Sequence, residues 1–258
     1  MRRSFPIEFV YQVFALIIAV ILVHAVYVAV VRPNADLVLR QEAALVKADP
    51  SHVVRHSVYV IVRDYEQETC FILMLWALSI LAYKGVEAYR ERRLLDRDLL
   101  RIDGQQRIGP EHTLELARRI ETLPAPMRNC LLARALRAAI ERFAATRDIQ
   151  AAASAKHEVC DTESERLESE LSIIRYIAWA IPSIGFIGTV RGIGDALGQA
   201  HKAVAGDITG VTQSLGVAFN STFIALVISL VLMFFIYQLQ LVQERLVLDT
   251  GTSTATIT

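Results

Sequence analysis

Four apolar runs, separated by charged sequence, organise this chain. They cover residues 9–31, 70–83, 173–190 and 215–237. A helix that crosses a bilayer needs about 20 mainly apolar residues, with a range of about 17–25. The first, third and fourth runs reach this length, whereas the second is short and would be ambiguous by itself. The pattern therefore predicts four membrane-spanning helices, or three if the second run does not cross.

The segment between the second and third runs has a different pattern. Residues 85–172 are rich in Arg, Glu, Leu and Ala and poor in β-branched residues, which is typical of helices. Glycines and prolines at 104, 109, 110, 124 and 126 interrupt the pattern, and residues 127–156 are expected to form one helix. The predicted fold is an all-α membrane protein with a helical bundle inserted before the last two spans.

The distribution of arginines gives an orientation. Lys and Arg gather on the cytoplasmic side of membrane proteins, and five arginines follow the second run: Arg90, Arg92, Arg93, Arg97 and Arg101. Four spans then place both termini inside; three would place the N-terminus outside. We divide the chain into a first span (1–31), an extracytoplasmic segment (32–69), a second span (70–84), a cytoplasmic helical domain (85–172), paired spans (173–241) and a flexible cytoplasmic tail (242–258).

The last two runs carry small and hydroxyl residues on one helical face, at about 100° per residue. In the third run this face holds Ala178, Gly185, Thr189, Gly192 and Ala196, and in the fourth it holds Ala218, Thr222, Ala225 and Ser229. Small residues allow close packing of helices, Gly188 and Gly192 form a G-x-x-x-G pair, and hydroxyls can bond a partner or water. Close packing is the simpler interpretation, and a polar path between helices is the alternative.

Composition narrows the function classes. The chain has 258 residues, of which 53% are hydrophobic, and a mean hydropathy of +0.38. Its formal net charge is zero, so it lacks the basic field expected of a nucleic-acid-binding protein. The three cysteines are widely spaced and suit neither a disulfide framework nor a zinc site. No set of acids, Ser/His pair or metal ligands within the spans points to an enzyme, a metal or a cofactor.

Two short motifs resemble a known family. GFIGTVRGI at 185–193 and AFNSTFIAL at 218–226, in this order and each within an apolar run, are similar to the paired membrane motif of the MotA/TolQ/ExbB ion-channel subunits. The resemblance covers roughly a quarter of the chain, from about residue 172 to 243. Four spans would resemble the MotA plan, and three would resemble TolQ and ExbB.

The resemblance implies a function for the chain. Such subunits form a ring in the bacterial inner membrane, commonly a homopentamer, around two copies of a single-span partner of the MotB/TolR/ExbD kind. The partner supplies the aspartate that takes H⁺ or Na⁺, and ion flow drives rotation or force transmission. By motif, Thr189 and Thr222 would line the ion path, with Ser229 on the same face. Gly185, Gly188, Gly192, Ala218 and Ala225 would provide close helix packing.

The chain departs from the family pattern at two places. Val217 stands near the position where TolQ and ExbB relatives usually have a glutamate, which weakens assignment to that branch. Arg191 lies inside GTVRG and is expected either to face the outer interface and extend its charge toward water or to pair with Asp195 one turn later. Asn220 is expected to make an interhelical hydrogen bond. Arg191, Asp195 and Asn220 are thus candidate interface residues.

A different function class remains open. The chain could be a membrane scaffold or receptor whose cytoplasmic helices bind a signalling partner while the spans only anchor it. In that case the outward-facing residues of 111–156 would matter and the two threonines would not.

Overall fold

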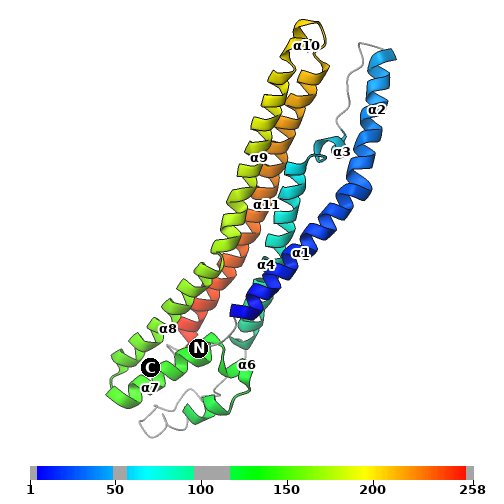
Figure 1. Ribbon diagram of the computed structural model, residues 1–258. Helices are drawn as coiled ribbons and strands as arrows, with labels where there is room; N and C mark the ends of the chain where they lie inside the picture. The colour runs from blue at the N-terminus through cyan, green and yellow to red at the C-terminus, as the bar shows by residue number, and fades with distance from the viewer. Residues whose placement is uncertain (1–4, 49–56, 96–116, 254–258) are drawn as a thin grey trace. The chain divides into compact units, whose positions relative to one another are not determined.

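The computed structural model describes residues 5–48, 57–95 and 117–253. These residues are almost entirely helical, and no strand occurs among them. Figure 1 shows that several of these helices are long. The elements in chain order are α1 (Phe5–Val26), η1 (Tyr27–Val31), α2 (Arg32–Ala48), α3 (Val58–Ile61), α4 (Tyr65–Leu95), α6 (Ala125–Arg128), α7 (Leu131–Thr146), α8 (Ile149–Glu170), α9 (Ser172–Gly198), α10 (Ala200–Val204) and α11 (Thr209–Ser253).

Four of the helical stretches are long and apolar enough to cross a membrane: Glu8–Val46, Tyr65–Leu94, Ile149–Gly198 and Thr209–Thr252. The prediction of an all-α membrane protein is confirmed. The short second run lies within α4, a helix of 31 residues that extends beyond the run in both directions, and this helix is one of the four candidate spans. The chain is a multi-pass membrane protein.

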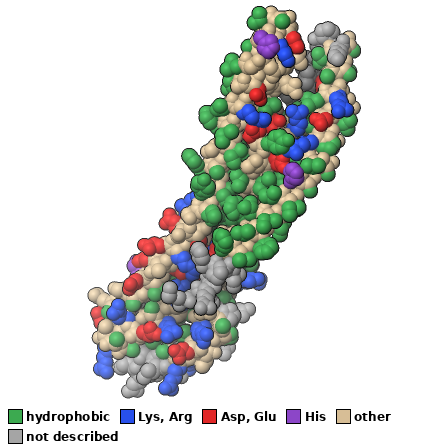
Figure 2. All heavy atoms as spheres, in the orientation of Figure 1, with side chains coloured by type: hydrophobic (Ala, Val, Ile, Leu, Met, Phe, Trp, Pro, Cys, Tyr) green, Lys and Arg blue, Asp and Glu red, His purple; other side chains and the backbone are tan. Residues whose placement is uncertain are grey.

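Contacts divide the chain into two compact units. The first unit comprises Met1–Leu81 and Ile173–Phe235, and the second comprises Ala82–Ser172 and Ile236–Thr258. In the first unit, apolar side chains cover much of the visible helix surface, and a group of acidic and basic side chains lies among them (Figure 2). Exposed apolar side chains on these helices, such as Phe14, Ile21, Phe186 and Leu230, suit contact with lipid or other membrane helices.

The first helix does not end where its apolar run ends. A π-helical turn, η1, connects α1 to α2, and the amide of Arg32 donates to the carbonyl of Tyr27. Pro33 follows, and proline has no N–H to donate and crowds the carbonyl four residues before it. A π turn is a common way for a helix to pass such a residue. The side chain of Asn34 donates to the Val30 carbonyl at 2.7 Å, so the helix continues beyond the proline.

In the second unit, α7 packs against α8. The buried face of α7 contributes Leu132, Ala133 and Leu136 to a core cluster that also contains Ile120 and Cys130, which precede this helix. Glu91 of α4 accepts a hydrogen bond of 2.7 Å from the first amide of α7. Arg134 donates to Glu163 of α8 at 2.8 Å, so a buried carboxylate has a cationic partner.

The single helix expected at 127–156 is instead two helices. Arg147 ends α7 in a left-handed conformation with φ of 54°. Asp148 then caps α8, because its side chain accepts from the Gln150 amide at 2.9 Å. Short polar side chains favour such caps over helix interiors. Residues 96–116, where we expected the end of one helix and the start of the next, lie outside the described residues.

The expectation of a flexible tail at 242–258 is wrong as far as Ser253, because α11 continues as a helix to that residue. Packing within the second unit explains why these residues are helical. Leu246 and Thr250 are buried, and Lys156 of α8 donates to the Gly251 carbonyl at 2.9 Å. Residues 254–258 lie outside the described part of the chain.

Candidate functional site

The helices α9 and α11 approach closely in the first unit, at the glycines of the third apolar run. A Cβ atom placed on Gly185 would lie 2.5 Å from the Cβ of Ala225, and one on Gly188 would lie 2.6 Å from the Cβ of Ser221. A Cβ on Gly192 would lie 2.8 Å from the Cβ of Ala218. Carbon atoms normally stay about 3.5–4.0 Å apart. These positions therefore require glycine because the partner helix occupies the space of a side chain.

Thr189 and Thr222 face each other across this contact. Their hydroxyl oxygens are hydrogen-bonded to each other. Thr222 Oγ1 also lies 3.1 Å from the Gly185 carbonyl, and Thr189 Oγ1 lies 3.1 Å from the Ala218 carbonyl and 3.3 Å from that of Gly185. Both side chains are only partly buried. The structure therefore brings the two motif threonines together at one place on the α9–α11 pair.

Counting protons defines what this pair can do. Each hydroxyl has one hydrogen to donate and two lone pairs to accept with. The two hydrogens cannot serve all four contacts at once. In one arrangement, Thr189 donates to Thr222, and Thr222 donates to the Gly185 carbonyl. Lone pairs then remain free on both oxygens. The pair can accept a hydrogen bond from a protonated acid or coordinate a cation, but it cannot itself carry a proton at neutral pH.

Ser229 has a different partner. Pro182 lies inside α9 and has no N–H, so the carbonyl of Ala178, four residues earlier, loses its helical partner. The Ser229 hydroxyl donates to this carbonyl at 3.0 Å. A hydroxyl that supplies a missing backbone bond is a structural feature of a proline-containing helix. We therefore leave Ser229 out of the ion path proposed below.

The expected pairing of Arg191 with Asp195 is wrong. The Arg191 guanidinium forms a two-pronged ion pair with Glu66 of α4, with Nε–Oε1 and Nη2–Oε2 distances of 2.7 and 2.8 Å. The side chain of Glu66 is 12% exposed. A partly buried carboxylate outcompetes Asp195, which is exposed, because two parallel bonds to a guanidinium form the favoured geometry. Periodicity along one helix does not predict this partner on another.

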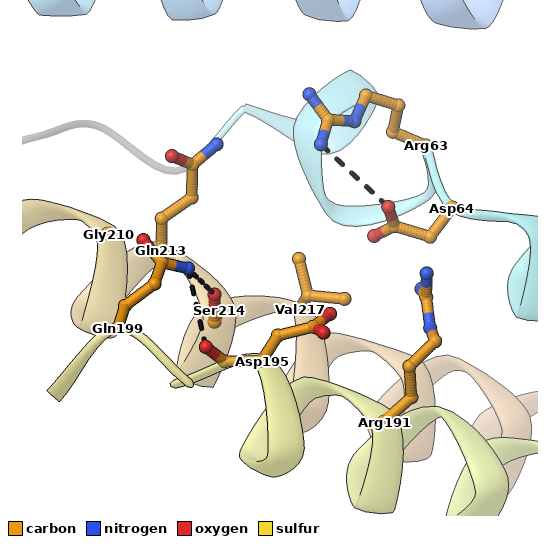
Figure 3. Close-up of a pocket in the computed structure, with 9 residues that line it drawn as sticks. All are labelled: Arg63, Asp64, Arg191, Asp195, Gln199, Gly210, Gln213, Ser214 and Val217. Carbon is orange, nitrogen blue, oxygen red and sulfur yellow. Dashed lines mark hydrogen bonds and ion pairs between the residues drawn. The ribbon is translucent and has the colours of Figure 1, made fainter. Parts of the chain in front are cut away.

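Asp195 instead lines a polar pocket of about 240 Å³ (Figure 3). Arg63 and Asp64, from the turn between α3 and α4, face residues of α9 and α11 there. Burial raises the pKa of the Asp64 carboxyl, and the guanidinium of Arg63 opposes this shift. The remaining lining residues are Arg191, Gln199, Gly210, Gln213, Ser214 and Val217. Val217, where a glutamate was expected in some relatives, therefore faces this pocket.

Asn220 is half-buried, and the structure gives its side chain no interhelical hydrogen bond within the described residues.

Sequence reasoning also missed three buried or nearly buried polar residues that touch this region: Glu66, Gln67 and Ser221. The first two lie in charged sequence just before the second apolar run, and Ser221 stands next to Thr222. Polar residues at the edge of a span were the available signal. No group of metal-binding side chains occurs in the part of the chain that the structure describes.

Residues 128–250 match the MotA/TolQ/ExbB proton channel family. The match covers 123 of the 258 residues, just under half of the chain, and supports membership of this family. The matched segment contains both threonines, all three close-packed glycines and Ser229. No curated protein and no solved structure matches the chain. The matching family is a proton channel family and not an enzyme family.

Proposed function

We propose that the chain is the ring subunit of an ion-driven motor in a bacterial inner membrane. Several copies, five by the family resemblance, would surround two single-span partner helices of the MotB/TolR/ExbD kind. Ion flow, most simply of H⁺, would drive rotation or force transmission. The family match supports the channel class, and the four apolar helices are compatible with the membrane location.

The observation that carries the proposal is the threonine pair. Its two hydroxyl hydrogens are shared among the contact between the hydroxyls and contacts to two backbone carbonyls, those of Ala218 and Gly185. Both hydroxyls keep acceptor capacity on a partly open surface. A neutral carboxylic acid arriving from a partner could donate its proton there, whereas a carboxylate would have to draw a hydroxyl hydrogen away from a carbonyl. The pair would thus distinguish the two protonation states of a visiting aspartate.

Orientation follows from the arginines after the second apolar run. We place the second unit in the cytoplasm, and the turn that includes α10 and the segment that includes α2 outside. The proton would then approach the threonine pair from the side of α10 and leave toward the cytoplasm. Cysteine accessibility at His201 of α10, measured in intact cells with a membrane-impermeant reagent, tests this orientation.

The test of function is the replacement of each threonine by valine, which keeps the volume and removes the hydroxyl. We expect Thr189→Val and Thr222→Val to lower ion flux by about 10- to 150-fold, because a hydrogen bond to a charged or charge-forming group contributes about 1.5–3 kcal/mol. Flux is measured in vesicles with a pH-sensitive dye, on the complex co-expressed with its genomic neighbour. Ring assembly, followed by native mass, should be preserved.

Thr212→Val provides the matched control. Thr212 lies on the same helix, but its hydroxyl bonds carbonyls of its own helix, Ile208 and Thr209. This variant should conduct normally. Normal flux in both Thr189→Val and Thr222→Val would reject the ion-path assignment. If the chain also failed to form a ring with a partner, the scaffold function would be favoured.

A further inference from the structure

One turn of α4 is bonded to four other helical elements of the first unit. Three consecutive residues are involved, and each bonds in a different direction. Glu66 pairs with Arg191 of α9, Gln67 reaches Ser221 of α11, and Glu68 bonds His24 of α1 and Arg32 of α2. Because consecutive helix residues differ by about 100°, a single turn can contact helices on several sides. This turn, residues 66–68, is called the polar turn below.

Two of the three residues of the polar turn are buried, and the third, Glu66, is nearly so. Gln67 is 0% exposed and Glu68 is 6% exposed. Glu68 accepts from His24 Nδ1 at 2.7 Å and also from Arg32. Burying a carboxylate without a partner is costly, whereas a paired and hydrogen-bonded one is tolerated. The hydrogen bonds from His24 and Arg32 therefore compensate for the burial of the Glu68 carboxylate.

The polar turn also contacts the direct neighbours of both threonines. A Cβ atom on Gly188, which precedes Thr189, would lie 3.2 Å from Cγ of Glu66. Nε2 of Gln67 lies 3.5 Å from Oγ of Ser221, which precedes Thr222, and it also donates to the Ile61 carbonyl at 3.0 Å. The polar turn thus lies against α9 and α11 at the level where their threonines meet.

Of these contacts, the ion pair between Glu66 and Arg191 is the strongest link to α9. It has two short bonds, whereas the bond from Gln67 to Ser221 is long. The Glu66 stem occupies the space beside Gly188 because the Arg191 guanidinium holds its carboxylate. Without this partner, the nearly buried carboxylate would turn toward water and leave the side of Gly188. The α9 helix could then shift relative to α11, and the threonine hydroxyls would separate.

We propose that Glu66 and Arg191 are positioning residues, whose ion pair holds α9 against α4 so that the Thr189 and Thr222 hydroxyls stay within bonding distance. The importance of this distance for ion flux rests on the proposed function, but the positioning itself does not. Arg191 acts at a distance from the ion, through the location of Gly188 and Thr189. Exchanging the two charges should therefore preserve the effect.

The experiment measures threonine geometry directly, without relying on ion flux. In a background in which Thr189 and Thr222 are both replaced by cysteine, and the native cysteines by alanine, we measure the rate of disulfide formation in the full-length chain. We expect Arg191→Glu and Glu66→Arg each to slow this rate by about tenfold, as expected for changes in coupled contacts. The double exchange should restore it, and a restored rate shows that the two residues act through each other.

Arg63→Glu is the matched control. It changes the charge of the same pocket by the same amount, but Arg63 pairs only loosely, with Asp36 at 3.9 Å and Asp64 at 3.8 Å. It should leave the rate unchanged. Where a charge reversal prevents folding, Glu66→Gln and Arg191→Lys replace it. The first should slow the disulfide reaction, and the second should slow it less than Arg191→Glu, because lysine keeps the charge but cannot form the two-pronged pair.

The outcomes are distinct. Unchanged disulfide rates in both single variants, no recovery in the double exchange, or an equal loss in Arg63→Glu would each overturn the proposal. Ion flux is measured in parallel in the chain that retains both threonines. Loss of flux in Arg191→Glu with an unchanged disulfide rate would also overturn it. If the unaltered chain conducts no ions but the rates behave as expected, the positioning stands and the proposed function fails.

Discussion

Replacing Gly185 by alanine tests the close approach of α9 and α11 most directly. The added methyl group would lie 2.5 Å from the Cβ of Ala225 and 3.1 Å from the Ser221 carbonyl oxygen. Since carbon atoms pack at about 3.5–4.0 Å, the two helices must separate by about 1 Å. The methyl group meets a β-carbon and backbone atoms, which cannot rotate away.

This separation would change the threonine pair as well as the packing. The distance from Thr222 Oγ1 to the Gly185 carbonyl is 3.1 Å, and about 1 Å more takes it beyond hydrogen-bonding range. Overpacking costs about 1–3 kcal/mol, and a lost hydrogen bond about 1 kcal/mol. We therefore expect Gly185→Ala to lower the free energy of unfolding by about 2–4 kcal/mol.

The assay is unfolding in mixed micelles with increasing SDS, followed by the fluorescence of the two tryptophans, Trp76 and Trp179. Gly194→Ala is the matched control, since Gly194 lies on the same helix and a Cβ there meets nothing within 4 Å. It should be neutral or slightly stabilising because alanine favours helices. Adding Ala225→Gly to Gly185→Ala moves the methyl group to the other helix and should recover most of the loss.

Equal stability of Gly185→Ala and Gly194→Ala would refute the reasoning, because it would mean that α9 and α11 are not in contact at this level. Failure of Ala225→Gly to compensate would show that the clash lies elsewhere. The double-mutant comparison is valid because the two positions are in direct contact.

Two further predictions follow from single contacts. Ser229→Ala should cost about 1 kcal/mol in the same unfolding assay, because it leaves the Ala178 carbonyl beside Pro182 without its donor. Ion flux should be unchanged in this variant, and a large loss of flux would return Ser229 to the ion path. Burial raises the pKa of the Cys130 thiol, so the thiolate that reacts with alkylating reagents is scarce. Cys130 should be modified slowly at pH 8 in mild detergent and rapidly in SDS, as measured by mass spectrometry; rapid modification before unfolding would contradict its burial.

The amino-acid sequence predicted the class of this protein and the elements of its site. Apolar length identified three of the four candidate spans and left the second open, because the cost of exposing backbone and polar groups to lipid leaves few alternatives to a long apolar helix. The period of an α-helix placed Thr189 with the glycines on one face, and Thr222 with Ala218 and Ala225 on another. These are local properties of each segment, and the order of two motifs was enough to indicate the family.

The sequence did not predict contacts between segments that are far apart along the chain. A helix wheel suggested Asp195 for Arg191, but the actual partner, Glu66, stands 125 positions away along the chain. The polar character of 242–258 suggested a flexible tail, but burial of Leu246 and Thr250 keeps it helical to Ser253. Periodicity predicts which face of a helix is apolar and which is polar. Only the packed structure shows which other helix contacts that face, because the pairing of helices depends on burial and charge contributed by several elements together.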